Sequence, residues 1–169
     1  LAEEGINLFL AGAPQDLRAW LDALREDPRF AGLPAKESFS EQQPFKRLKV
    51  KVKREIIRMN MPAVRPSEGR APAVTPATLA RWVEQGHDDA GRPLLMLDTR
   101  NGFEVDAGAF EGAVDWRLRK FSDFPAALAA HREALQSHTV VSYCTGGIRC
   151  EKAALVMQAA GLPHSYQLE

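Results

Sequence analysis

The chain has 169 residues, of which 45% are hydrophobic and 26% are charged, and its 22 Lys and Arg balance 22 Asp and Glu. This composition is that of a folded globular protein and excludes a disordered or collagen-like chain. The apolar runs are far shorter than the ~20 residues that a membrane helix requires, so we expect no membrane association.

Residues 1–62 are predicted to form a small α/β domain. Residues 6–10 are strand-like, and apolar side chains then recur at helical spacing, at Leu17, Trp20, Leu21 and Leu24. Residues 47–53 alternate strictly between basic and apolar side chains, which is typical of a strand with one face in a core. Two prolines, a glycine and no periodicity predict a linker at residues 63–73.

Residues 74–169 alternate between strand and helix patterns. Short apolar runs predict buried strands at 94–97, 139–143 and 165–168. Thr75 and Pro76 form a typical helix start, and Gly86 is expected to end that helix. This alternation predicts an α/β domain with a mainly parallel sheet and helices on both faces.

The strand at 139–143 runs directly into a cysteine loop and then a helix, with the sequence Cys144-Thr145-Gly146-Gly147-Ile148-Arg149. Two glycines let backbone N–H groups point inward at a helix start, an arrangement that favours negative charge. We therefore expect Cys144 to be a thiolate nucleophile and Arg149 to add a cation. Tyrosine-phosphatase-like loops have five residues between Cys and Arg, and the four found here argue against phosphatase activity.

Several neighbours of this loop are candidates for supporting roles. Asp98 and Arg100 follow a buried strand and are expected to hold the loop by charge-assisted hydrogen bonds, with Glu104 paired to Arg100. Cys150 either resolves an oxidised or persulfidated Cys144 or is a small buried residue of the following helix. No His or Cys spacing indicates a metal site, and no flavin motif is present.

The alternating segment carries a row of cations at Arg47, Lys49, Lys51 and Lys53. If a strand forms, these side chains share one face at ~7 Å spacing and can follow an RNA backbone. The alternative is a solvated edge strand whose lysines prevent aggregation.

Three strings together resemble the tRNA uridine(34) hydroxylase family of rhodanese-domain proteins, namely Glu4-Gly5-Ile6-Asn7, Leu97-Asp98-Thr99-Arg100-Asn101 and the ten residues from Cys144 to Ala153. The resemblance implies a ferredoxin-like or acylphosphatase-like domain followed by a rhodanese-like domain at 74–169. It also implies oxygen-dependent hydroxylation of the wobble uridine to 5-hydroxyuridine in the cytoplasm, with tRNA rather than DNA as partner and Cys144 as the essential cysteine. Family members extend further at both ends, which together with the missing initiator Met indicates a piece of a longer protein.

The residues leave two other functions open. One is a sulfurtransferase that moves sulfane sulfur through a Cys144 persulfide to an acceptor thiol. The other is a non-enzymatic RNA-binding module, against which the intact cysteine loop argues. The basic segment favours a tRNA enzyme over a sulfur carrier, because a sulfur carrier needs no cationic face. The sequence contains no signal for the oligomeric state.

Overall fold

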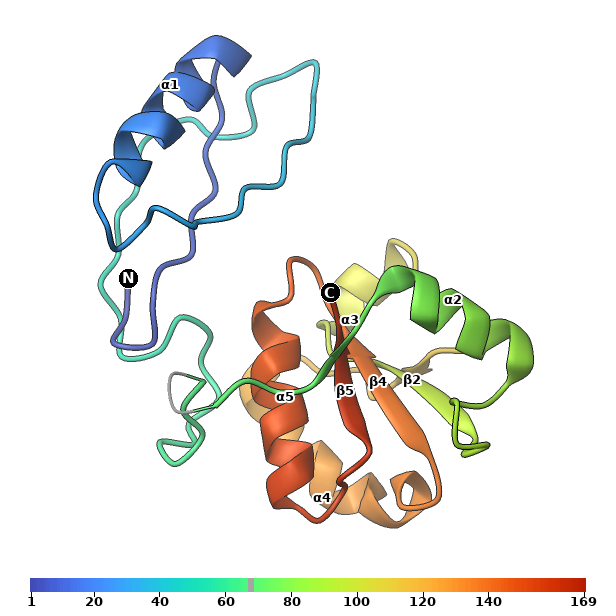
Figure 1. Ribbon diagram of the computed structural model, residues 1–169. Helices are drawn as coiled ribbons and strands as arrows, with labels where there is room; N and C mark the ends of the chain where they lie inside the picture. The colour runs from blue at the N-terminus through green and yellow to red at the C-terminus, as the bar shows by residue number, and fades with distance from the viewer. Residues whose placement is uncertain (67–68) are drawn as a thin grey trace. The chain divides into compact units, whose positions relative to one another are not determined.

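The computed structural model describes residues 1–66 and 69–169, which form two compact units (Figure 1). The first unit contains Leu1 and residues 6–52, and the second contains residues 2–5 and 53–169. The division therefore falls after Val52 rather than after residue 62, because residues 53–62 pack with the second unit, where Met59 is part of the core. Residues 67 and 68 of the predicted linker lie outside the described residues.

The first unit contains one helix, α1 (Pro14–Arg25), at the position predicted from the apolar spacing. The strands predicted at 6–10 and 47–53 are absent from this fully described part of the chain, where no residue is buried. Leu48, Val50 and Val52 are 70–84% exposed, so the prediction that they face a core is wrong. An alternating segment forms a stable strand only when a paired neighbour and an apolar layer offset its conformational entropy, and this unit provides neither.

The second unit is built on a five-stranded parallel sheet of order β1-β5-β4-β2-β3, which confirms the predicted α/β fold. Its strands are β1 (Ala73–Val74), β2 (Leu94–Asp98), β3 (Val114–Asp115), β4 (Thr139–Tyr143) and β5 (Ser165–Leu168). Its helices are α2 (Pro76–Gln85), α3 (Gly102–Asp106), the 3-10 helix η1 (Phe121–Asp123), α4 (Phe124–Leu135) and α5 (Ile148–Ala159). None of the helices that the structure describes is long and apolar enough to cross a membrane.

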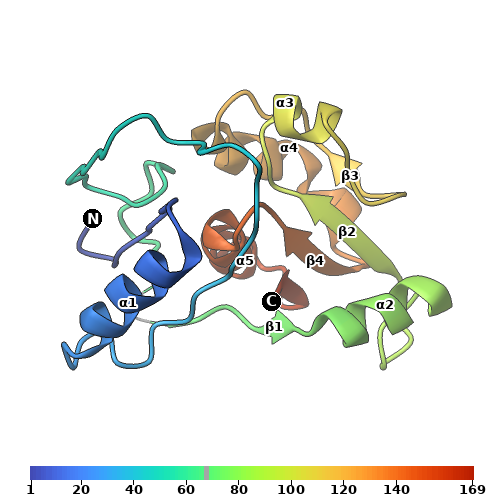
Figure 2. The same cartoon turned by 90° about the horizontal axis from the view of Figure 1, so that it is seen from above.

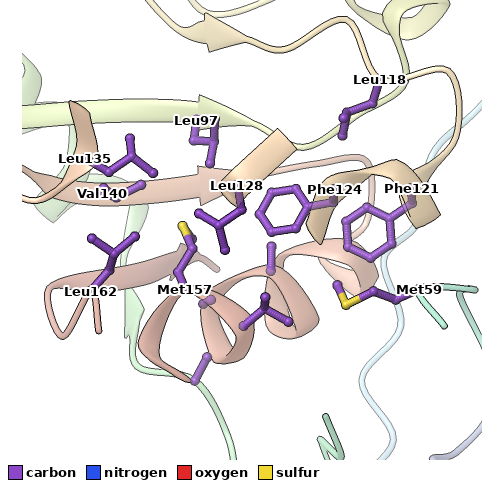
Figure 3. Packing of buried hydrophobic residues seen from close by; sticks show 14 residues of the cluster. Met59, Leu97, Leu118, Phe121, Phe124, Leu128, Leu135, Val140, Met157 and Leu162 are labelled. Atoms are coloured by element: carbon purple, nitrogen blue, oxygen red, sulfur yellow. The ribbon is translucent and has the colours of Figure 1, made fainter. Parts of the chain in front are cut away.

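Helices cover both faces of the sheet (Figure 2). On one face, α4 and α5 pack Phe124, Leu128 and Met157 against strand residues such as Leu97 (Figure 3). On the other face, α2 packs Trp82 and its neighbour Leu79 against Met96, Val141 and Tyr143. Successive strand residues thus point to opposite apolar layers, as expected for a sheet buried on both sides.

One buried cation on α5 joins three segments of the second unit. The Nζ atom of Lys152 lies 2.8 Å from a carboxylate oxygen of Glu4 and 2.9 Å from one of Glu55, and it donates to the carbonyl oxygen of Ile57 at 3.0 Å. Its side chain is only 4% exposed. Glu4 also accepts the backbone N–H of Ile56, so residues 2–5 and 53–57 are both fixed to the helix that follows the cysteine loop.

The register of the sheet decides what lies beside the cysteine loop. Asp98, the last residue of β2, is paired with Tyr143, the last residue of β4. Both the Thr99 N–H and the Thr99 hydroxyl donate to the Tyr143 carbonyl oxygen, at 3.1 and 3.0 Å. The segment that leaves β2 is therefore held against the start of the loop that leaves β4, at the carboxyl edge where parallel sheets place their sites.

Candidate active site

The cysteine loop turns the chain from β4 into α5 within four residues. Cys144 directly follows β4, and Gly147 is the N-cap residue of α5. Gly146 and Gly147 have φ values of +82° and +80°, a left-handed conformation that strains any residue with a Cβ atom. The two glycines therefore allow the chain to place the Cys144 sulfur at the amino end of α5, where N–H groups lack helical partners.

The pKa of Cys144 is lowered to about 6. The largest cause is a hydrogen bond from the Cys150 thiol, and it outweighs the opposing effect of burial. The backbone N–H groups of Arg149 and Cys150 lower the pKa further, and the Arg149 charge adds a smaller attraction. Most of the Cys144 population is therefore thiolate at neutral pH, as a nucleophile requires.

Arg149 is neutralised by a carboxylate from another helix. Its two terminal nitrogens donate to the two carboxylate oxygens of Glu104 on α3, at 2.6 and 2.7 Å, and its side chain is 9% exposed. Thr145 also donates to Glu104, at 3.1 Å. The Arg149 hydrogen bonds are the main reason why the pKa of Glu104 is lowered to about 2. Glu104 thus clamps the cysteine loop at two points.

The predicted pairing of Glu104 with Arg100 is wrong. Arg100 instead forms an ion pair with Asp98 at 2.6 Å and meets Glu104 only at its backbone oxygen. A second Arg100 nitrogen donates to the Gly108 carbonyl oxygen at 2.7 Å. In the part of the chain that the structure describes, neither Asp98 nor Arg100 bonds to residues 144–147, so this pair fixes the segment after β2 and supports the loop only indirectly.

Cys150 is completely buried in the first turn of α5. Its sulfur lies 3.8 Å from the Thr99 hydroxyl oxygen, and the neighbouring Cys144 and burial together raise the pKa of Cys150 well above its usual range. Of the two neighbouring thiols, Cys144 has the lowered pKa and Cys150 the raised one. The placement agrees with a small buried residue, and its redox role stays a prediction.

Residues 1–56 match the family model of the UPF0176 acylphosphatase like domain, in agreement with the domain type expected at the amino end. A protein of Bordetella petrii named tRNA uridine(34) hydroxylase is 66% identical over all 169 residues, which cover 67% of its length. One of Bordetella pertussis with the same name is 62% identical, with 69% of its length covered. The chain belongs to the tRNA uridine(34) hydroxylase family. The resemblance found in the sequence is thereby confirmed.

The chain spans between 60% and 70% of the length of its curated relatives in the tRNA uridine(34) hydroxylase family. Among solved structures, a human single-domain sulfurtransferase is 23% identical, with a TM-score of 0.45, 58% of this chain covered and 88% of that chain covered. A rhodanese-like domain from Anabaena is 20% identical, with a TM-score of 0.46 and coverage of 58% and 67%.

Two residues at the site of this tRNA uridine(34) hydroxylase family member were not recognised from the sequence in their observed roles. Glu104 contacts a loop 41–45 residues further along the chain, and Thr99 lies beside Cys150, which is 51 residues away. A local signal for Glu104 exists, since its carboxylate accepts the backbone N–H of Asn101 at 3.1 Å, which fixes it at the first turn of α3.

The row of cations lies in the first unit and at the start of the second. Arg47, Lys49, Lys51 and Lys53 are all exposed, but so are the apolar residues between them, because the segment is not a strand. The row is therefore accessible to solvent without the single cationic face that was predicted. Among the described residues, no group of three or more His, Cys, Asp or Glu side chains is arranged to hold a metal ion.

Proposed function

We propose that this protein hydroxylates uridine 34 of tRNA to 5-hydroxyuridine, with Cys144 as nucleophile, molecular oxygen as co-substrate and an external two-electron reductant that converts the second oxygen atom to water. The observation that supports this proposal most directly is a Cys144 thiol whose pKa is about 6, held at the amino end of α5 in a chain of this family. A thiolate at a helix start is a strong nucleophile, and a uracil ring is an electrophile to which a thiolate can add.

Each side chain of the site has a distinct part in this proposal. Cys144 attacks the substrate, while the hydrogen bond from Cys150 keeps it ionised. Arg149, Glu104 and Thr145 hold the loop in one conformation through bonds of 2.6 to 3.1 Å, so that the sulfur keeps its position when substrate arrives. The Asp98–Arg100 pair positions the segment that carries Glu104.

The partner that we infer is tRNA, and the location is the cytoplasm, where tRNA is present. The exposed cations from Arg47 to Lys53 support this, because basic segments can bind phosphate backbones without a rigid face. Replacing Lys49, Lys51 and Lys53 by Ala is expected to weaken tRNA binding. The slope of log affinity against log salt concentration should also become less steep by about 0.7 to 0.9 for each lost phosphate contact.

The second candidate is a sulfurtransferase, which uses the same thiolate to carry sulfane sulfur. The observation that favours it is the short loop, which has room for a sulfur atom on Cys144 and is smaller than a phosphate-binding loop. Both candidates require Cys144, so a Cys144 variant alone does not distinguish them. Only the tRNA hydroxylase requires RNA binding and produces a modified nucleoside.

The experiment is nucleoside mass analysis of tRNA from a deletion strain complemented with the full-length gene. We expect 5-hydroxyuridine to return with the wild type and with Glu133→Gln, an exposed change on α4, and to stay absent with Cys144→Ser. Purified protein assayed for sulfur transfer from thiosulfate covers the alternative. Modified uridine in the Cys144→Ser strain, or sulfur transfer without any modified uridine, would reject the proposal.

A further inference from the structure

Two phenylalanine rings are exposed on the segment that follows β2. Phe103 on α3 is 71% exposed and Phe110 is 51% exposed. They are the only exposed aromatic side chains among the described residues of the second unit. Exposure of single apolar residues is common, but two exposed rings within residues 99–113, the one connection between β2 and β3, form a feature that folding alone does not explain.

Both residues belong to the segment that is held against the cysteine loop. Phe103 directly precedes Glu104, whose carboxylate binds Thr145 and Arg149. The backbone N–H of Phe110 donates to the hydroxyl of Tyr143 at 3.3 Å, and the two rings meet edge to face with centroids 4.8 Å apart. Tyr143 is the residue before Cys144. Figure 1 shows α3 at the same edge of the sheet as the amino end of α5.

The exposure of these rings is fixed by the structure around them. The Glu104 carboxylate accepts the Asn101 N–H at the start of α3, so the Phe103 backbone lies in a defined first turn. The Arg100 guanidinium donates to the carbonyl oxygens of Glu104 and Gly108, one on each side of the turn that ends α3. The rings are therefore presented on a braced segment and lose little conformational entropy when they bind a ligand.

The charges of this edge decide which part of a nucleic acid fits it. Arg149 is paired with Glu104, and Arg100 is paired with Asp98. The exposed Arg117, whose guanidinium lies beside Gly102, is paired with Asp106 at 2.7 Å and with Asp115 at 3.4 Å. These three neutralised cations attract phosphate weakly, whereas the exposed Arg119, next to the Leu118 that pairs with Asn101, can meet a phosphate beside the base. Beside these charges the edge offers the neutral π face of an aromatic ring, which suits a nucleobase.

We propose that Phe103 and Phe110 form a stacking site for an unpaired pyrimidine base of an RNA loop, beside the thiolate that acts on it. This inference rests on the proposed function, because it concerns how the substrate base is delivered to Cys144. A base inside a helix is inaccessible to a side-chain nucleophile, whereas an unstacked loop base needs a new stacking partner. The two rings would supply that partner, on the segment whose Glu104 binds the cysteine loop and whose Phe110 contacts the residue before Cys144.

The first test measures the affinity of the full-length protein for an anticodon stem-loop RNA with uridine at position 34. Stacking on an aromatic ring contributes about 1–3 kcal/mol per base, so Phe103→Leu or Phe110→Leu is expected to weaken binding about 5- to 150-fold. Phe103→Tyr should restore affinity because it keeps the π face. Val83→Ala on α2, an exposed apolar position outside this edge, is the control and should bind as the wild type does.

The second test does not depend on catalysis. In Phe103→Trp, stem-loop RNA should quench the new indole fluorescence, and a stem-loop lacking unpaired pyrimidines should quench it less. Quenching in a protein that forms no 5-hydroxyuridine would reject the proposed function and keep the stacking site. Wild-type affinity in both Leu variants, with hydroxylation intact, would overturn the stacking site alone. A loss of self-association in these variants, with RNA affinity unchanged, would also overturn it and assign the rings to a protein contact.

Discussion

Replacing Cys150 by Ala is expected to raise the pKa of the Cys144 thiol without any change to Cys144 itself. The Cys150 hydrogen bond is the largest cause of the low pKa of Cys144. A hydrogen bond to a charged group contributes about 1.5–3 kcal/mol, which corresponds to about 1–2 pKa units. The pKa of Cys144 should therefore rise from about 6 to roughly 7–8, and the thiolate fraction at pH 7 should fall from about nine-tenths to a half or less.

The assay has to follow pH, because a single rate at pH 7 is misleading. A thiolate of higher pKa is intrinsically more nucleophilic, with a Brønsted coefficient of about 0.4–0.5, and this gain offsets much of the lost ionisation. We expect the midpoint of the iodoacetamide rate profile for Cys144 to move up by about 1–2 pH units in Cys150→Ala. The plateau rate at high pH should increase.

Cys150→Ser is the matched control, since its hydroxyl retains a donor at the same position. Its midpoint should stay within half a pH unit, roughly, of the wild type. The reasoning would fail if Cys150→Ala left the midpoint near 6, because the loop amides and Arg149 would then suffice to ionise Cys144. It would also fail if Ala and Ser shifted the midpoint equally, which would indicate a packing effect.

Three further predictions concern stability. Glu104→Gln should lower the unfolding free energy by about 3 kcal/mol at pH 7. Because the folded pKa of Glu104 is depressed to about 2, the wild type should lose this contribution as pH falls from about 4.5 to 2. The unfolding free energies of wild type and variant, measured by urea titration, should therefore become equal at the acid end of this range. Gly147→Ala should cost about 1–2 kcal/mol from its left-handed backbone alone, since a Cβ atom there meets nothing within 4 Å, and a larger loss in calorimetry would contradict this. Lys152→Met should lower the unfolding free energy by about 3–5 kcal/mol, because Glu4 and Glu55 would lose their buried cation. An unchanged thermal midpoint would show that these ion pairs do not stabilise the fold.

The parts of the fold that were predictable are those with strong local signals. Thr75 accepts the backbone N–H of Thr78 as an N-cap should, and Gly86 ends α2 with φ of +76°. The buried strands and the glycine turn after Cys144 also depend on residues that are adjacent in sequence. Propensity and turn chemistry act over such distances, so these elements could be placed without any tertiary information.

The parts that were missed depend on partners far away in sequence. Nothing local to Glu104 shows that it binds Arg149, 45 residues later, because the choice between Arg149 and Arg100 depends on the register of β2 against β4. The alternation across residues 47–53 predicted a strand from side chains alone. A strand also needs a hydrogen-bonded neighbour and an apolar layer, which the sequence pattern does not report.

The buried Lys152 has a practical consequence for dissecting the protein. A fragment beginning at Lys53 would keep the whole sheet and the cysteine loop, yet it would discard Glu4 and so remove one of the two carboxylates around a buried ammonium. The Ile56 N–H would lose its acceptor in the same cut. A stable fragment that keeps the sheet and the cysteine loop therefore needs a carboxylate from outside residues 53–169, for example from residues 2–5 fused through a short artificial connection. Separating or exchanging the two units therefore requires that the buried Lys152 keeps both of its carboxylate partners.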